Sequence, residues 1–478
     1  MPQIFIDGQP FQARTEQTVL EVADENGIYI PRLCWHKKLS IAGNCRICVV
    51  QVEGRSWVEI SCNMPVSEGL RVLTDSELVR EHRKATMQFL TLNHPVDCGI
   101  CDKAGECTLQ DYHVAFNGEP SISQEPKVVA SKFYSLSSRI TLDNERCILC
   151  TRCVRFTREV SKSHALGVRN RGDHSLIRPA DDHPLDADAY SDNIVDLCPV
   201  GALLSKSFLY KDRVWYLKAT PSVCPGCERG CNIDIWHRKP EWQFKAPAGS
   251  SHNREIARVT PRENDAVNGP WVCNKARDLA LMLDRRRADA PMLKGRDVPL
   301  HEALAAARQL IAAARRPVAL VSSWASNEEL AAFQRTLAPR FACFVKNDHV
   351  AQPGEVVQDD LLIRADKNPN GHTARALFGS AEVAFPADTD LVLVWGEGCD
   401  FARLPRGVKV IFLNAFLAAE NGHADVFLPT SLHTERHGHY TNFEGVTSAF
   451  SACFKKPAGV VDAERVFETL AQPEAVTS

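Results

Sequence analysis

The sequence predicts a multidomain chain of mixed α+β and α/β class, and three observations support that prediction. The chain has 478 residues, which at roughly 100–200 residues per domain corresponds to about three to four folded units. Fifteen of its 18 cysteines lie between Cys34 and Cys273. After residue 285, apolar segments of strand type alternate with segments of helical periodicity, which indicates a mostly parallel α/β sheet.

Local patterns predict the individual elements. The segment QIFIDGQPFQA predicts a hairpin around Asp7-Gly8, and TVLEVADENG a short amphipathic helix followed by strands in RICVVQVEG and SWVEISC. Residues 79–95 have helical periodicity that ends at His94-Pro95. Residues 97–280 are weakly periodic, as expected where metals organise the backbone. Later segments predict helices in LHEALAAARQLIAAARR and NEELAAFQRTLAPRF, and strands in PVALVSS, TDLVLVWGEG and VKVIFLNAF.

The composition excludes several classes of protein. A net charge of −3 with 44% hydrophobic and 24% charged residues is typical of a globular protein and argues against disorder and nucleic-acid binding. We expect no membrane-spanning helix, because no run of about 18 apolar residues occurs. The segment MPQIFIDGQPFQA lacks the features of a secretory signal. Clustered C-x2-C pairs in such a chain predict metal ligands rather than disulfides.

The first cysteine group has the spacing C-x10-C-x2-C-x13-C and comprises Cys34, Cys45, Cys48 and Cys62. Four thiolates suit a [2Fe–2S] cluster, in which each iron takes two cysteines. Gly43 in the turn GNCRIC would let the backbone approach the cluster and direct amides at sulfur. A zinc knuckle is the alternative, although the long first spacing is unlike zinc-finger pairs. The segment resembles the β-grasp [2Fe–2S] ferredoxins found at the start of large electron-input subunits.

The second group follows the spacing H-x3-C-x2-C-x5-C and comprises His94, Cys98, Cys101 and Cys107. A zinc site with three cysteines and one histidine is the alternative on spacing alone. The segment HPVDCGICDKAGECTLQD resembles the large iron–sulfur subunit of NADH:quinone oxidoreductase (respiratory complex I). That resemblance implies a [4Fe–4S] cluster held by one histidine and three cysteines. An imidazole in place of a thiolate should raise the potential of the cluster.

The third group occurs in RCILCTRC and LCPVGAL and comprises Cys147, Cys150, Cys153 and Cys198. Two-cluster ferredoxins repeat the run C-x2-C-x2-C-x3-C-P, and each fourth cysteine ligates the opposite cluster. In this sequence the four ligand positions of the other cluster are occupied by Thr157, Asp188, Ser191 and Ile194. The segment therefore predicts a ferredoxin-like domain that retains one [4Fe–4S] cluster, with a zinc site as the alternative.

The fourth group occurs in VCPGCERGCNIDI and GPWVCNKAR and comprises Cys224, Cys227, Cys231 and Cys273. It resembles the [4Fe–4S] entry domain of molybdopterin oxidoreductases and of many large subunits of complex I. The last gap, 41 residues, is longer than is usual in those families, and we assign the extra length to RKPEWQFKAPAGSSHNRE. Zinc remains the alternative here as well.

The C-terminal part predicts a shortened molybdopterin-oxidoreductase-like α/β domain with a structural or docking role. Cys343, Cys399 and Cys453 are interpreted as buried thiols. The segment HTERHGH, with His433, His437 and His439, is interpreted as a solvated loop rather than a metal site. No candidate ligand for a molybdenum cofactor is present, and neither G-x-G-x-x-G nor a phosphate-binding loop occurs, so we expect no molybdopterin, NADH or flavin on this chain.

These resemblances imply five domains and a role in electron transfer. The expected domains are a β-grasp [2Fe–2S] ferredoxin domain, a helical segment with one-His/three-Cys ligands, a ferredoxin-like [4Fe–4S] domain, a molybdopterin-oxidoreductase-type [4Fe–4S] domain and the α/β domain, at residues 1–78, 79–118, 119–218, 219–275 and 276–478. The cofactors would be one [2Fe–2S] cluster and three [4Fe–4S] clusters, one of them with a His ligand.

The complex I family further implies an electron-relay subunit without a substrate site of its own. It would receive electrons from a flavin/NADH-binding subunit and pass them to a ferredoxin-like subunit of the quinone module. It would lie on the cytoplasmic face of the inner membrane as a peripheral part of the complex, without inserting into it. One alternative is a diaphorase subunit of an NAD-linked hydrogenase or formate dehydrogenase, and another is a zinc-organised scaffold protein.

Overall fold

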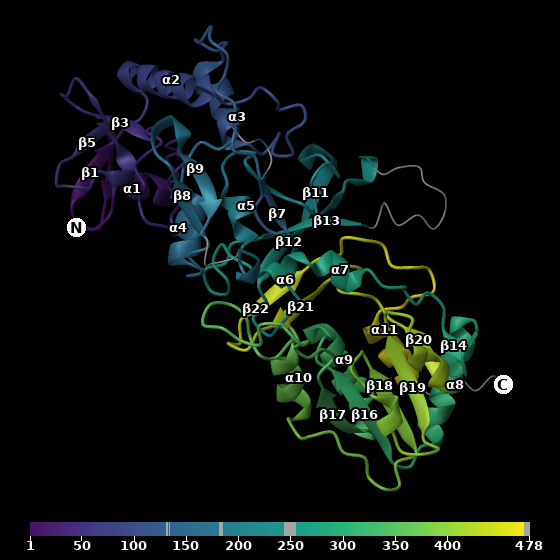
Figure 1. The fold of residues 1–478 in the computed structure, drawn as a ribbon. Helices are drawn as coiled ribbons and strands as arrows, with labels where there is room; N and C mark the ends of the chain where they lie inside the picture. Colours follow the sequence, from purple (N-terminus) through teal and green to yellow (C-terminus); the bar gives the residue numbers. More distant parts are fainter. Residues whose placement is uncertain (131, 133, 181–184, 243–254, 473–478) are drawn as a thin grey trace. The chain divides into compact units, whose positions relative to one another are not determined.

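The chain divides into two compact units, Met1–Tyr216 and Leu217–Ser478. The computed structural model describes residues 1–130, 132, 134–180, 185–242 and 255–472, and Figure 1 shows the ribbon of both units. None of the described helices has the length and apolar composition needed to cross a membrane.

The first unit begins with a mixed sheet in the order β2-β1-β5-β3-β4. The predicted hairpin is confirmed, with Asp7 and Gly8 at the turn, both at positive φ. Thr18 caps helix α1 in a capping box with Glu21, and the helix packs its apolar face on the sheet. The elements are β1 (Gln3–Ile6), β2 (Gln9–Gln12), α1 (Val19–Glu25), β3 (Val49–Val52), β4 (Val58–Ile60) and β5 (Arg71–Leu73).

The predicted helix before His94-Pro95 is confirmed as α2 (Glu77–Leu92), which Ser76 caps. Two short segments follow, α3 (Thr108–Tyr112) and η2 (His113–Asn117), and η2 packs against both α2 and α3. The remainder of the unit has two small antiparallel sheets and short helices. They are β6 (Tyr134–Ser135), β7 (Ile140–Leu142), α4 (Arg152–Glu159), β8 (Leu166–Arg169), β9 (Leu176–Pro179), α5 (Asn193–Leu197) and β10 (Leu203–Ser205).

The second unit opens with an antiparallel sheet that the weak periodicity of residues 97–280 does not predict. It consists of β11 (Leu217–Val223), β12 (Asn232–Arg238) and β13 (Ile256–Pro261). In β12 the alternate residues Ile233, Ile235 and His237 are buried, so a period of two is present. One of these inward positions is a histidine, which weakens the apolar signal. Short helices α6 (Asn274–Arg277) and α7 (Leu279–Leu283) follow.

The rest of the second unit is the predicted α/β sheet, in the order β15-β14-β20-β19-β18-β16-β17. Strands β16 to β20 pair in parallel, which confirms the expectation from the alternating pattern. Helices α8, α9 and α11 pack together, with the rings of Phe333, Trp395 and Phe467 in mutual contact. A hairpin, β21 and β22, lies against β11.

The bounds of these elements are β14 (Met292–Leu293), β15 (Arg296–Asp297), α8 (Leu300–Ala313), β16 (Pro317–Ser322), α9 (Asn327–Thr336), β17 (Ala342–Lys346), α10 (Gly371–Phe378), β18 (Leu391–Trp395), β19 (Lys409–Asn414), β20 (Val426–Pro429), β21 (Gly438–Thr441), β22 (Thr447–Phe450) and α11 (Ala463–Ala471).

Candidate metal centres

The first cysteine group forms two pairs of thiols. All four side chains are buried, in loops around β3 and in the short turn that contains Cys62. The thiol of Cys34 hydrogen-bonds that of Cys45, and Cys48 hydrogen-bonds Cys62. These bonds lower the pKa of Cys34 to about 5 and that of Cys48 to about 7. A two-by-two arrangement of thiols fits two irons with two thiolate ligands each.

The second group has three cysteines in one loop and a partly buried imidazole, that of His94. Cys101 and Cys107 are buried, whereas Cys98 is exposed. Burial raises the pKa of Cys101 and that of Cys107 above the ordinary value of a thiol. The Nδ1 atom of His94 is buried and has no hydrogen-bond partner in the described part of the chain. Burial lowers the pKa of His94 to about 4, so the ring is neutral and available as a metal ligand.

Within the described residues, the buried Nδ1 atom of His94 forms no hydrogen bond to a sulfur atom. The imidazole and the Cys101 thiol share two charged neighbours, Asp97 and Arg146. Gly201, from the segment after Cys198, lies so close that a Cβ atom there would stand 2.2 Å from the Cys101 Sγ atom. Only glycine fits at that position, and it brings the loops of the second and third groups together.

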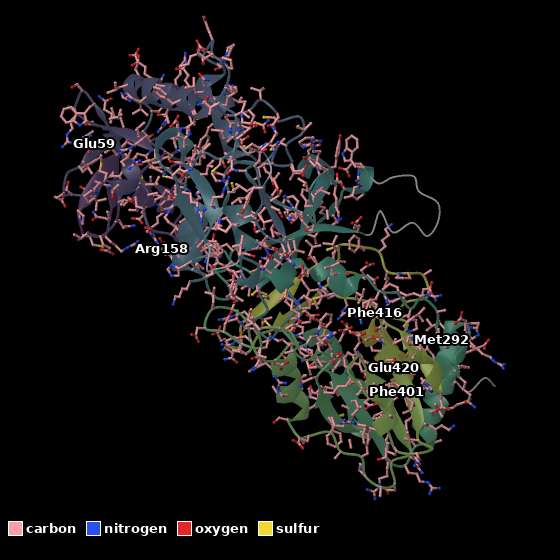
Figure 2. All side chains as sticks on the ribbon, in the orientation of Figure 1. Glu59, Arg158, Met292, Phe401, Phe416 and Glu420 are labelled. Atoms are coloured by element: carbon pink, nitrogen blue, oxygen red, sulfur yellow. The ribbon has the colours of Figure 1, made fainter. Side chains whose placement is uncertain are left out.

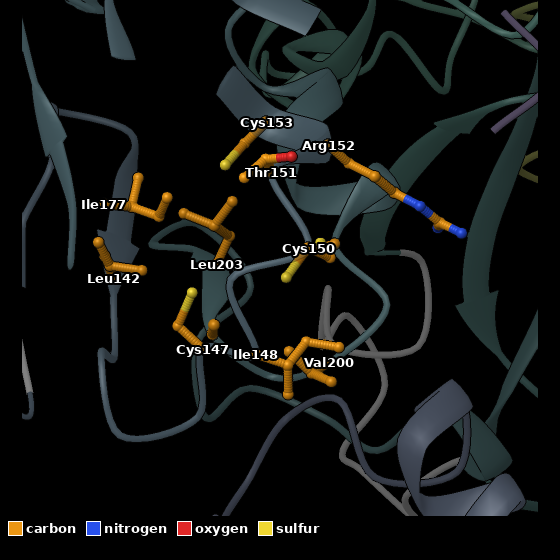
Figure 3. Close-up of a pocket in the computed structure, with 12 residues that line it drawn as sticks. Leu142, Cys147, Ile148, Cys150, Thr151, Arg152, Cys153, Ile177, Val200 and Leu203 are labelled. Carbon is orange, nitrogen blue, oxygen red and sulfur yellow. The ribbon is translucent and has the colours of Figure 1, made fainter. Parts of the chain in front are cut away.

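The third group lines a single pocket. Cys147, Cys150 and Cys153 come from the loop and first turn of α4, and Cys198 follows α5. Apolar side chains of β7, β9 and β10 complete the wall, and Figure 3 shows the labelled cysteines directed toward the same space. Burial, and then the charge of neighbouring cysteines, raises the pKa of Cys147 to about 12 and that of Cys150 to about 11.

These raised pKa values indicate that the pocket needs added positive charge before its thiols can ionise. Four thiols that line one apolar pocket cannot all ionise side by side without positive charge among them. Metal coordination supplies that charge and deprotonates a thiol outright. The donor set of the third group therefore fits a metal cluster.

The fourth group surrounds the turn between β11 and β12. The Cys224 amide donates to the carbonyl oxygen of Cys231 (2.8 Å), and the Gly226 amide donates to the Cys224 Sγ atom (3.4 Å). Burial raises the pKa of Cys273 to about 11, and the charge of Cys227 adds to this effect. Of the segment that we interpreted as extra length, residues 243–254 lie outside the described residues.

Non-glycine residues with positive φ lie between the cysteines of two groups. Arg46 has φ 58° between Cys45 and Cys48, and Leu149 and Thr151 have φ 51° and 58° in the third group. Such conformations cost about 1–3 kcal/mol each and accumulate at functional sites. In the third group the Leu149 amide donates to the Cys147 Sγ atom at 3.4 Å. The sequence contained no signal for this strain, because none of the three is a residue that favours positive φ.

Among the described residues, no three or more His, Cys, Asp or Glu side chains are arranged to hold one metal ion. A cluster distributes its protein ligands over several irons and fills the remaining positions with sulfide. The protein ligands of a cluster therefore lie farther apart than the ligands of a single metal ion.

The C-terminal histidines differ from expectation. His433 is 2% exposed, so the prediction of a solvated loop is wrong for this residue, whereas His437 and His439 are exposed. Neither ring nitrogen of His433 has a hydrogen-bond partner in the described residues. The thiols of Cys343, Cys399 and Cys453 are partly rather than fully buried.

His433 lines a pocket that sequence reasoning missed. The pocket lies at the carboxyl ends of β16, β18, β19 and β20, with Trp324, Trp395, Asn414 and Thr430 in its wall. Ligands of open α/β sheets bind at such an edge. Its lining comes from separate strand ends, so no local motif identifies it.

Four family models match consecutive parts of the chain. The 2Fe-2S iron-sulfur cluster binding domain matches residues 2–77, and the NADH-ubiquinone oxidoreductase-G iron-sulfur binding region matches residues 83–119. The ferredoxin-like domain of NADH-quinone oxidoreductase subunit 3 matches residues 137–204, and the molybdopterin oxidoreductase Fe4S4 domain matches residues 217–284. The chain therefore contains 2Fe-2S and 4Fe-4S binding domains, and each cysteine group lies within one match.

Two named relatives are similar to this chain over more than half of its length. The chain is 39% identical over 296 residues to the mitochondrial NADH dehydrogenase [ubiquinone] iron-sulfur protein 1 of Solanum tuberosum, covering 62% of this chain and 38% of that protein. It is 38% identical over 295 residues to the NADH-ubiquinone oxidoreductase 75 kDa subunit of Reclinomonas americana, covering 62% and 40%. The chain thus spans about two fifths of the length of these relatives. A chain of an NAD+-reducing [NiFe]-hydrogenase structure matches with 31% identity and a TM-score of 0.41, covering 45% of this chain and 91% of that one.

Proposed function

We propose an electron-relay function for this chain, which is a relative of the large iron–sulfur subunit of NADH:quinone oxidoreductase. The resemblance predicted from the motifs is confirmed by the named relatives and the family models. Because the chain spans only part of those relatives, its activity as a subunit of the oxidoreductase and its partners are part of the proposal.

The proposal assigns one cluster to each cysteine group. Bound clusters would supply one-electron transfer, and the polypeptide would hold them and set their potentials. A [2Fe–2S] cluster would be held by Cys34, Cys45, Cys48 and Cys62, and three [4Fe–4S] clusters by His94, Cys98, Cys101 and Cys107, by Cys147, Cys150, Cys153 and Cys198, and by Cys224, Cys227, Cys231 and Cys273. Each of the first four domains predicted from the sequence would contain one of these sites, and the fifth, residues 276–478, would contain none.

The observation that carries the proposal is the pocket of the third group. Its thiols come from two segments separated by more than forty residues, and they meet in one apolar pocket. Burial raises the pKa of Cys147 to about 12 and that of Cys150 to about 11, and a bound metal would supply the positive charge that favours their thiolates. The matched ferredoxin-like domain of residues 137–204 contains all four.

The partners and location follow the family. We propose a flavin- and NADH-binding subunit as electron donor and a ferredoxin-like subunit leading to quinone as acceptor, in a complex peripheral to the cytoplasmic face of the inner membrane. Exposed Cys98 and the exposed apolar side chains of Val96 and Ile100 leave the second site near the surface. An electron would therefore have a short distance to cross between that site and a docked protein.

Anaerobic analysis of iron, sulfide and zinc in the purified chain, freed from iron-containing partners, tests the proposal. One [2Fe–2S] and three [4Fe–4S] clusters predict about 14 iron atoms per chain with little zinc. About 10 iron atoms would indicate one empty four-iron site. Several zinc atoms with almost no iron would contradict the electron-relay function and support a zinc-organised scaffold protein.

A further inference from the structure

Arg155 connects the first candidate site to the third. It lies on α4, two residues after Cys153, and is 4% exposed. Its Nη2 atom donates to the carbonyl oxygens of Cys34 (2.5 Å) and Cys150 (3.1 Å), and its Nη1 atom donates to the carbonyl oxygen of Ser40. One guanidinium group therefore contacts a ligand residue of each of two separate sites.

The charge of Arg155 has no carboxylate partner. In the described part of the chain, no carboxylate oxygen forms an ion pair with it within 4.0 Å. Glu159, one turn later on α4, accepts hydrogen bonds from Ser40 and Arg158 instead. Arg146, another buried arginine of this unit, is paired with Asp97 and Asp143. The direct hydrogen bonds of Arg155 therefore go to carbonyl oxygens rather than to carboxylates.

A second arginine on the same helix joins the Cys34 loop to the other ligand segment of the third site, which precedes Cys198. Arg152 donates to the carbonyl oxygen of Trp35 (2.7 Å) and to that of Leu197 (3.2 Å). Trp35 follows Cys34 and Leu197 precedes Cys198. The separation of the first and third sites is therefore set by side chains of α4.

We propose that Arg155 is a positioning residue that raises the reduction potentials of the first and third clusters together. This inference rests on the proposed function. Reduction adds a negative charge to a cluster, and a nearby buried cation stabilises that charge in a medium of low dielectric constant. Because one guanidinium lies beside both sites, its field acts on both in the same direction. The difference between the two potentials, which drives transfer between them, therefore changes by less than the larger of the two shifts.

Redox titration of the purified full chain followed by electron paramagnetic resonance tests this proposal. The variants are R155Q, which removes the charge, R155K, which retains it, and R158Q as a matched control. Arg158 lies on the same helix with its side chain 56% exposed and paired with Glu159 (Figure 2). The signal of the third cluster is identified by its loss in C198S.

We expect the midpoint potentials of the first and third clusters to fall in R155Q and to stay near wild type in R155K and R158Q. The potential of the second cluster is an internal reference and should not move. A shift in neither or only one of the two clusters in R155Q would overturn the proposal. If R155Q does not retain iron, the result for R155K tests the proposal instead. An R155K chain that retains its iron and has both midpoint potentials near wild type supports the proposal. An R155K chain that loses iron, or in which these potentials shift, overturns it. A wild-type chain without cluster signals would instead contradict the proposed function.

Discussion

Arg146 and Asp97 form a two-point ion pair that joins the second candidate site to the third. The Nη2 atom of Arg146 lies 2.6 Å from Oδ2 of Asp97, and its Nε atom lies 3.2 Å from Oδ1. Asp97 precedes Cys98 and Arg146 precedes Cys147. The pair therefore holds two ligand loops at a fixed separation, as the carbonyl contacts of Arg155 do for the first and third sites.

Breaking this pair should destabilise the first unit. In R146Q the carboxylates of Asp97 and Asp143 lose their buried cation, and removal of one partner of a buried pair costs about 3 kcal/mol. The urea midpoint of the purified chain measures the effect. The control is K84Q, because Lys84 forms an exposed pair with Glu119 and such pairs contribute less than about 1 kcal/mol. Equal midpoints for the two variants would show that the Arg146 pair has no structural role.

Replacing His94 by cysteine should leave the second cluster in place and lower its potential. A thiolate adds negative charge to the cluster where a neutral imidazole added none. Redox titration of H94C against wild type measures the shift. H113C is the matched control, because His113 lies in the adjacent η2 segment and its Nδ1 atom contacts Asn117. An unchanged potential in H94C would show that His94 is not an iron ligand.

The variant C198S should lose one four-iron cluster. Serine lacks the thiolate that completes the third pocket, and the iron content should fall from about 14 to about 10 atoms per chain. C343S provides the control, since Cys343 packs at the edge of the α/β core and should have no effect on iron content. Retention of all iron in C198S would mean that Cys198 is not a ligand.

Burial of His433 should make the second unit sensitive to acid. Burial lowers the pKa of His433 to about 3, and Arg436 contributes further, whereas the unfolded chain has a value near 6.5. Below about pH 6.5 the unfolded state binds a proton that the folded state does not, so stability falls by about 1.4 kcal/mol per pH unit from this group until pH approaches 3.

In the variant H433F the free energy of unfolding should fall less steeply with decreasing pH than it does in wild type. The ring packs against Trp324 and Phe450 and its nitrogens have no hydrogen-bond partner among described residues, so phenylalanine loses no such bond. Urea midpoints of wild type, H433F and the exposed control H437F between pH 4 and 7 measure the effect. Parallel profiles for wild type and H433F would show that His433 titrates at its ordinary pKa.

Much of the organisation was determined by the sequence alone, because it is encoded over short distances. The hairpin at Asp7-Gly8, the stop of α2 before Pro95 and the parallel sheet of the second unit all follow from turn residues and periodicity. The C-x2-C pairs predicted metal chemistry because closely spaced thiols need no knowledge of the fold to be identified as ligands.

Only the tertiary structure decided what depends on contacts between distant segments. The pocket that Cys198 completes, the place of Arg155 between the carbonyl oxygens of Cys34 and Cys150, and the contact of Arg146 with Asp97 join residues separated by more than forty positions. Neither the burial of His433 nor the pocket beside it was visible in the loop sequence, because burial depends on the strands that pack around it. The ligands of each site can be predicted from local sequence motifs. The distance between two sites and the electric field at each of them depend on tertiary packing.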